Sequence, residues 1–414
     1  MPEPASLDDR LAIGRTELFA DIDQPPMDRL GRRAATLRRR RRAATAAGSL
    51  AAFLMVGTIA VQPWLRATGT PAPVAGVLPS GGPIYSGGGI TVNGLVDPRS
   101  VVKLAGTIAD VEFTDADHGF LVTACQRDAT GCQPAFASTT DGGLTWTLRP
   151  PPPLPASAVA NILTFPDNVL ALDIGDENLT LTSGDAGQEW TVLGRSRPSV
   201  RQAAPGEVLH VHTIGDACAD GPVEVWGPEG GLLGTLLAQP DLDVCQVERV
   251  TAADNTWWAS GTFDGQPAVA TTTDGGLNWT RQILPGAGTA RLASFGLRVY
   301  AVVTGADAAL RAIYYAPRGG TLTEVAASGL RPPTVVGEPI SLPDGRLLIA
   351  SAGRWYVSQD NGASFTRIEG KEVNLPWIGK FARTPAGYVA YNLFQAGWAA
   401  FSSDGATWRK FPVH

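Results

Sequence analysis

The sequence predicts an all-β fold: a seven-bladed β-propeller of four-stranded antiparallel blades, preceded by one transmembrane helix. Three observations predict it. Short apolar runs alternate with turn residues in a 414-residue chain that holds 48 Gly and 32 Pro, as is typical of all-β domains. A polar turn followed by an aromatic residue recurs, first as DGGLTW at 141–146. An uncharged apolar run occupies residues 43–65.

The first segment, residues 1–42, is basic. It holds ten Arg against seven acidic residues, and eight of the ten Arg lie between Arg29 and Arg42. The whole chain has a net charge of −6, so the rest of the chain is acidic. The Arg run lies directly before an apolar run, and positive charge is usual at the cytoplasmic end of a membrane-spanning segment. The Arg run therefore does not require a nucleic-acid partner, and none is predicted.

The second segment, residues 43–65, is predicted to be a transmembrane helix. It carries no charge, and about 20 apolar residues suffice to cross the hydrocarbon core as a helix. Trp64 at its far end suits the headgroup layer, and positive charge holds the other end in the cytoplasm. We therefore expect a single-pass protein of the cell membrane, with residues 1–42 cytoplasmic and the body extracytoplasmic.

Three other interpretations of the N-terminal region remain open. A cleaved signal peptide needs a shorter leader and a small-residue cleavage site, and RATGT at 66–70 is a poor one. A lipoprotein needs a Cys directly after the apolar run, whereas the first Cys is Cys125. A twin-arginine export signal is also conceivable. An uncleaved membrane anchor is the preferred interpretation.

Residues 66–98 are predicted to form a Pro/Gly linker, because they lack apolar periodicity and are rich in Pro, Gly and small residues. The end of this segment, Ile90–Leu95, has the composition of an additional edge strand. The four cysteines all follow the linker, and an even count on the outer side favours disulfides over metal ligands or a catalytic thiol. The pairing expected from sequence proximity is Cys125 with Cys132 and Cys218 with Cys245, and the sequence leaves other pairings open.

The remaining body, residues 99–414, is organised by a repeat. Four copies have the form Ser/Thr-x-Asp-x-Gly-x-x-aromatic, and a fifth copy is one residue shorter. Their principal members are Asp141, Gly143 and Trp146; Asp185, Gly187 and Trp190; Asp274, Gly276 and Trp279; Asp360, Gly362 and Phe365; and Asp404 and Trp408.

The spacing of these copies predicts the number of blades. Successive aspartates lie 44, 89, 86 and 44 residues apart, so two steps are double. Degenerate copies fill the gaps, with Pro228 and Leu233 in one and Pro317 and Leu322 in the other at the Asp and aromatic positions. Seven repeats of about 44 residues then predict seven four-stranded blades.

This motif resembles the Asp-box, or BNR, repeat of sialidase-like β-propellers. The resemblance covers residues 99–414. The photosystem assembly-factor propellers are similar in the boxes and in phrases such as FTDADHGF at 113–120. In the box, Asp and Ser/Thr side chains bond the turn backbone, Gly supplies a positive φ, and the aromatic residue packs between blades.

No catalytic site, metal site or cofactor is predicted. The box aspartates recur in every blade, whereas an active site needs one constellation. The resemblance to sialidases implies an Arg triad, a Tyr–Glu pair and an Arg-Ile-Pro motif, and no Arg-Ile-Pro occurs. His210 and His212 share one side of a strand, but the sequence offers no third metal ligand beside them, and a surface strand face is the preferred interpretation. Of the adjacent Trp257 and Trp258, one is expected in the core and the other is a candidate stacking platform.

The sequence therefore predicts a membrane-anchored, extracytoplasmic, non-catalytic propeller that acts as a binding or assembly scaffold for a protein or glycan partner. The alternative is a diverged exo-glycosidase, sialidase-like, that hydrolyses surface glycans.

Overall fold

A computed structural model describes twelve stretches of the chain, and the statements below concern these residues. The chain divides into two compact units, Met1–Val74 and Ala75–His414, and every described residue belongs to the second. The predicted segments 1–42 and 43–65 lie outside the described residues. These are 81–94, 104–125, 132–155, 158–174, 179–193, 198–212, 218, 221–250, 255–351, 353–370, 380–391 and 398–412.

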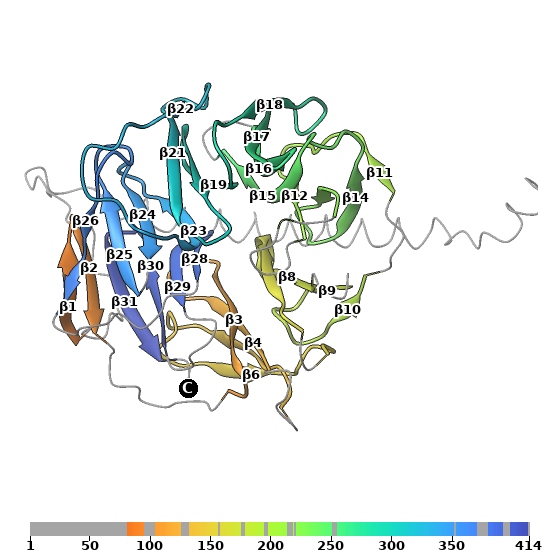
Figure 1. Cartoon of the computed structure of the whole chain (residues 1–414). Coiled ribbons are helices and arrows are strands. Elements are labelled where there is room, and N and C mark those ends of the chain that lie inside the picture. Colours follow the sequence, from red (N-terminus) through yellow and green to blue (C-terminus); the bar gives the residue numbers. More distant parts are fainter. Residues whose placement is uncertain are drawn as a thin grey trace, which may run out of the picture. The chain divides into compact units, whose positions relative to one another are not determined.

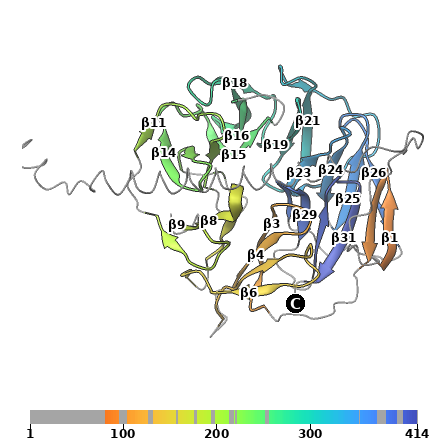
Figure 2. The same cartoon turned by 180° about the vertical axis from the view of Figure 1, so that it is seen from behind.

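Within these stretches the strands form six four-stranded sheets, called here blades one to six, and one seven-stranded sheet, called the large sheet. Figures 1 and 2 show the sheets standing side by side around a common centre. From the centre outward, blade one is β3 (Thr107–Phe113), β4 (Gly119–Ala124), β5 (Phe136–Thr139) and β6 (Thr147–Arg149); blade two is β7 (Asn161–Phe165), β8 (Val169–Ile174), β9 (Leu179–Ser183) and β10 (Thr191–Val192); blade three is β12 (Val208–His210), β13 (Glu224–Trp226), β14 (Leu232–Leu236) and β11 (Ser199–Val200).

The second half of the ring follows the same plan. Blade four is β15 (Asp243–Arg249), β16 (Trp257–Phe263), β17 (Gln266–Thr272) and β18 (Thr280–Ile283); blade five is β19 (Thr289–Phe295), β20 (Arg298–Thr304), β21 (Leu310–Ala316) and β22 (Thr323–Glu324); blade six is β23 (Val336–Ser341), β24 (Leu347–Ser351), β25 (Arg354–Ser358) and β26 (Thr366–Arg367). The large sheet runs β28 (Lys380–Thr384), β29 (Gly387–Tyr391), β30 (Trp398–Ser402), β31 (Thr407–Pro412), β2 (Ile90–Gly94), β1 (Gly81–Gly87) and β27 (Glu369–Gly370).

The prediction of seven four-stranded antiparallel blades is wrong, because the described residues contain six four-stranded blades. The last box, at Asp404, belongs instead to the large sheet, where β2 pairs in parallel with β31. The unpaired backbone edge of β31 explains this addition, since an exposed edge satisfies its N–H and C=O groups by accepting another strand. The hairpin β1–β2 and the short strand β27 then extend the sheet further.

Blade three also departs from the antiparallel plan. Its outermost strand, β11, precedes the rest of the blade in the chain and pairs in parallel with β14. The degenerate box at Pro228 therefore joins the second and third strands of its blade, whereas the box of blade one joins the third and fourth. Pro228 and Pro317 both lie in turns. Leu233, assigned to the aromatic position, is 37% exposed, while Leu322 is buried.

The predicted transmembrane helix is not found in the part of the chain that the structure describes. No helix there is both long and apolar enough to cross a bilayer. The apolar run on which the prediction rests, residues 43–65, falls outside that part.

The Asp boxes are turns held by side-chain hydrogen bonds. In the first box the Thr139 hydroxyl donates to Asp141 Oδ1 over 2.8 Å and accepts the Gly143 N–H over 2.8 Å. Asp141 Oδ1 also accepts the Thr145 N–H over 2.8 Å. The boxes around Asp185, Asp274 and Asp360 repeat these bonds, and the shorter box around Asp404 keeps most of them.

Each box glycine also packs against the preceding sheet. A Cβ on Gly187 would stand 2.2 Å from the Phe136 ring of blade one, and a Cβ on Gly276 would stand 2.5 Å from Leu236 of blade three. Gly143 of blade one faces the Phe411 ring of the large sheet in the same way. The glycine-containing turns therefore fix how closely neighbouring sheets approach, and the contact with Phe411 closes the ring between its first and last sheets.

The predicted disulfides are confirmed. Cys125 pairs with Cys132, and Cys218 pairs with Cys245. The first closes the loop between the second and third strands of blade one. The second ties the segment after β12 to the innermost strand of blade four, so it joins two neighbouring blades.

The Asp boxes predict acid sensitivity. In four boxes burial opposes the charged carboxylate, but hydrogen bonds to it outweigh burial and lower the pKa below 3.8; in the box of Asp185 the backbone bond from Glu189 is the largest cause. A lowered folded-state pKa adds stability that is present above the unfolded value and lost as the pH falls. We expect the melting temperature to decrease below about pH 4, and to decrease less in Asp360→Asn than in a matched Glu324→Gln variant. An equal acid response in both would contradict this role.

Candidate functional site

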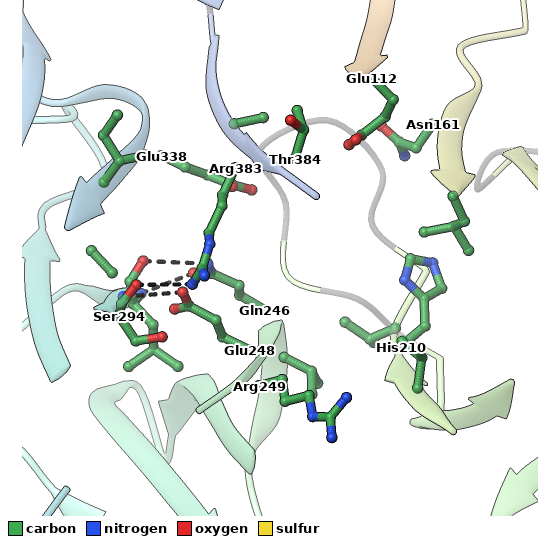
Figure 3. A pocket seen from close by; sticks show the side chains of 18 of the residues that line it. Glu112, Asn161, His210, Gln246, Glu248, Arg249, Ser294, Glu338, Arg383 and Thr384 are labelled. Carbon is green, nitrogen blue, oxygen red and sulfur yellow. Dashed lines mark hydrogen bonds between the residues drawn. The ribbon is translucent and has the colours of Figure 1, made fainter. Parts of the chain in front are cut away.

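The centre of the ring is a cavity of about 680 Å³. Its lining comes mainly from the innermost strands, β3, β7, β12, β15, β19, β23 and β28. Figure 3 shows charged and polar side chains from these different strands facing one another across it. This size lies within the range of about 300–1,000 Å³ that is usual for ligand sites.

Several polar groups in the lining lock neighbouring blades together. Asp110 Oδ2 accepts the backbone N–H of Ile162 from the next blade over 2.7 Å. Gln246 brackets the backbone of Leu292 with its amide oxygen and nitrogen, at 2.9 and 3.3 Å. Neighbouring sheets share no strand, so these bonds take the place of backbone pairing between them. The Asp110 and Gln246 side chains therefore hold neighbouring blades together whether or not a ligand is bound.

Other charged groups are half-exposed toward the cavity. Arg383 donates to the Ser294 carbonyl over 3.3 Å, and its guanidinium lies 5.2 Å from the centre of the Phe295 ring. Arg249 lies 5.8 Å from the centre of the Trp257 ring. Glu112 and Glu338 add negative charge on other strands of the lining. The cavity therefore presents both signs of charge on a rigid frame.

Glu248 is a second carboxylate of the lining that contacts the backbone of the next blade. Its Oε1 accepts the Ser294 N–H over 3.0 Å, and its Oε2 is buried with no hydrogen-bond partner among the described residues. Burial raises the pKa of Glu248, and the bond from Ser294 and the charge of Arg383 oppose that change. A buried carboxylate oxygen of this kind is costly unless a donor reaches it.

A second group of side chains lies where blades two and three meet. Asp173 is on β8, His210 is on β12, His212 follows β12, and Glu224 is on β13. His210 Nε2 lies 2.9 Å from Asp173 Oδ2, and His212 Nδ1 contacts Asp173 Oδ1. The other nitrogen of His212, Nε2, lies 2.9 Å from Glu224 Oε2. Both carboxylates are fully buried, and His210 reaches the central cavity.

The electrostatics of this group follow from its contacts. Burial opposes the charged imidazolium of His212, but the hydrogen bonds and charges of Asp173 and Glu224 outweigh it and raise the pKa of His212 to about 9. Burial likewise opposes the Asp173 carboxylate, while the bonds and charges of His210 and His212 lower the pKa of Asp173 to about 2. Asp173 and His212 therefore form a buried ion pair.

The structure places the sequence-derived residues in two different regions. The box residues lie in turns toward the outer strands, and none of them lines the cavity. Trp257 and Trp258 are both buried, so neither is an exposed stacking platform. His212 is buried and does not lie on a surface strand face.

Sequence reasoning missed Asp173 and Glu224. The only available signal was that each is an acidic residue in an apolar strand, in VLALDI at 169–174 and PVEVW at 222–226.

A sialidase-like constellation is not assembled in the described lining. It contains two arginines, Arg249 and Arg383, rather than three. The Tyr391 hydroxyl donates to Asp110 over 2.5 Å, but Tyr391 is fully buried and burial raises its pKa well above the ordinary value. The Tyr391 hydroxyl is therefore out of reach of a glycan in the cavity.

Part of the chain matches a known protein family. Residues 98–225 match the family described as "Photosynthesis system II assembly factor YCF48". The match covers less than half of the chain, and over those residues it confirms the resemblance to the photosystem assembly-factor propellers that the boxes indicate. No curated protein sequence matches this chain.

The chain is also similar to several solved structures. "YCF48 bound to D1 peptide" is 18% identical, with 76% of this chain and 84% of that chain covered and a TM-score of 0.36. YCF48 from Cyanidioschyzon merolae is 14% identical, with 72% and 93% covered and a TM-score of 0.47. The GH74 enzyme of Niastella koreensis is 14% identical, with 81% and 55% covered and a TM-score of 0.39.

Proposed function

We propose that this propeller is a non-catalytic binding scaffold, and that its central cavity holds an extended segment of a partner protein. The cavity carries the proposal: half-exposed groups of both charges, together with backbone-bonding polar side chains, line a rigid ring of innermost strands. A peptide presents N–H, C=O and charged groups, so it matches such a lining better than an apolar ligand does. The family match at 98–225 is to an assembly factor, which supports the same class of function.

We prefer a binding scaffold to a diverged glycosidase because hydrogen bonds already engage acidic side chains of the cavity lining. A glycosidase needs two carboxyl groups free to act on the bond between sugars. Asp110 accepts the Ile162 N–H and the Tyr391 hydroxyl, and Glu248 accepts the Ser294 N–H. These bonds commit two of the four acidic side chains of the lining, Asp110 and Glu248, to holding neighbouring blades.

We further propose that the propeller lies outside the cytoplasm. The two disulfides support this location, because disulfides persist in oxidising compartments and are rare in the cytosol. Attachment to a membrane through residues 43–65 stays a prediction from the sequence. Thiol labelling of intact and of lysed cells tests the location: the four cysteines should resist labelling in both until a reductant is added.

Site-specific crosslinking tests the binding function. A photoreactive amino acid is placed at Asn161 in the cavity lining, and the matched control places it at Val192, which is exposed on an outermost strand. We expect a partner protein crosslinked from Asn161 but not from Val192, with tandem mass spectrometry mapping the crosslink to one extended segment. In Arg383→Glu the crosslinked yield should decrease at least about tenfold, because a charged contact is inverted.

Two outcomes would overturn the proposal. One is equal crosslinking from both positions, or from Val192 alone, which would move binding to the outer surface. The other is turnover of fluorogenic sialosides or glucans by the full chain that is lost in Glu338→Gln, which would make the protein an enzyme. Arg318→Ala, on an exposed turn, is the control for loss of fold in the variants.

A further inference from the structure

We propose that Asp173, His210 and His212 bind a divalent transition-metal ion, with zinc as the best match, between blades two and three. This inference is independent of the proposed peptide binding. It is based on three side chains from two blades whose ligand atoms all lie within 4.8 Å of one another.

The residue types and spacing suit a metal. Two imidazoles and one carboxylate form a three-ligand set that is usual for open zinc sites, with metal–ligand bonds of about 2.0–2.2 Å. Such bonds place ligand atoms about 3–4 Å apart. The present atoms all lie within 4.8 Å of one another, and the close contact between His212 Nδ1 and Asp173 Oδ1 would have to open slightly to admit an ion. His210 Nε2 and His212 Nδ1 approach different oxygens of the same Asp173 carboxylate, so the three side chains already converge on one point.

Glu224 gives the site its outer support. Metal-binding histidines commonly donate the second ring N–H to a carboxylate, which fixes the tautomer and the ring orientation. His212 has this arrangement: Nδ1 faces Asp173, while Nε2 lies 2.9 Å from Glu224 Oε2. When Nδ1 binds the ion, Nε2 keeps its proton, and that N–H lies beside the Glu224 carboxylate.

Charge balance also favours a divalent ion. Asp173 and Glu224 are both fully buried, and once metal binding has displaced the proton from His212 these four side chains carry two negative charges. Burying uncompensated charge is costly. One divalent cation neutralises the four side chains without requiring a protonated histidine.

The site is reachable from the central cavity. His210 lines that cavity and its side chain is 18% exposed, whereas Asp173 is inaccessible. Figure 3 shows the imidazole of His210 at the cavity, across from the group around Arg383. Three protein ligands leave a fourth position for water or for an acceptor group of a bound molecule.

Metal titration tests the site. The full chain is purified oxidised, treated with chelator, exchanged into buffer without reductant, and titrated with zinc at pH 7.5 by calorimetry and by elemental analysis after gel filtration. We expect one zinc ion per chain. We expect His210→Ala and Asp173→Asn to weaken binding at least about 100-fold, and Glu224→Gln to weaken it about 10–100-fold, as loss of a supporting carboxylate does.

The matched control is His118→Ala. His118 forms another histidine–carboxylate pair, with Asp115 at 2.9 Å, but both side chains are about half exposed, so zinc binding should not change. Cobalt gives a second readout: its ligand-field absorption should appear on binding to the wild type and be lost in His210→Ala. Circular dichroism and melting curves establish that each variant is folded; if Asp173→Asn is not, His210→Ala decides alone.

The proposal is overturned if the wild-type chain takes up no stoichiometric zinc or cobalt. It is also overturned if folded His210→Ala binds both ions as tightly as the wild type does. Either result would assign the four side chains to a hydrogen-bonded network without metal.

Discussion

Trp408→Ala is expected to lower the free energy of unfolding by about 3–5 kcal/mol, the usual cost of removing a buried tryptophan. Trp408 is fully buried on β31. Its ring centre lies 4.9 Å from that of Trp355 on β25 of blade six and 5.8 Å from that of Phe381 on β28. Its Nε1 donates to the Gly405 carbonyl over 2.8 Å.

The size of this effect follows from where the ring lies. Trp408 and Trp355 belong to one apolar cluster that joins blade six to the large sheet. Removing the indole leaves a cavity between two sheets that are already fixed by other contacts, so the surroundings collapse only in part. The loss should therefore weaken the interface between the sheets.

Chemical denaturation measured by tryptophan fluorescence and circular dichroism checks this expectation. Trp190→Ala is the matched control, because Trp190 occupies the same place in its own box but is only partly buried. We expect the control to lose clearly less stability than Trp408→Ala. Equal losses would mean that the cost comes from the box turn and not from burial between sheets.

Gly275→Ala is expected to lower the free energy of unfolding by about 2–4 kcal/mol, through backbone strain and a steric clash. Gly275 lies in the third box with φ +70°. A Cβ there would stand 2.2 Å from the carbonyl oxygen of Ala203 in blade three. That backbone cannot rotate away as a side chain does, and the Gly275 carbonyl accepts the Ala203 N–H over 2.7 Å.

Gly265→Ala isolates the clash from the strain. Gly265 has nearly the same φ, +73°, but no atom lies within 4 Å of the place its Cβ would take. It should cost only about 1–2 kcal/mol, the price of a left-handed conformation. Urea unfolding of both variants measures the difference, and equal losses would show that the contact between blades three and four tolerates a methyl group.

The Asp-box repeat could be recognised in the sequence because the residues that form each turn are close together in the chain. A Ser or Thr, an Asp and a Gly within five residues close one turn by bonds among themselves, as Thr139, Asp141 and Gly143 do. The turn therefore forms wherever that pattern occurs, and its spacing sets the pace of the strands. The paired cysteines were readable for a similar reason, since proximity in sequence and an even count limited the choices.

The number of strands in each sheet was not readable, because sheet edges are completed by segments remote in sequence. β2 joins β31 across more than 300 residues, and β11 enters blade three from the preceding connection. The sheet edge that accepts an additional strand is one whose backbone N–H and C=O groups remain unpaired in the folded ring. No local sequence pattern indicates which edge this is.

By itself the sequence determined the box turns and the alternation of strand and turn, because each depends on residues close together in the chain, and it favoured the cysteine pairing that the structure shows. Only the tertiary structure decided that Asp173 and His210, 37 residues apart, meet at one point, and that Arg383, Glu248 and Glu338 face one cavity. The physical reason is the ring: it brings the innermost strands together at one centre, so the chemistry of that centre depends on closure and not on spacing along the chain.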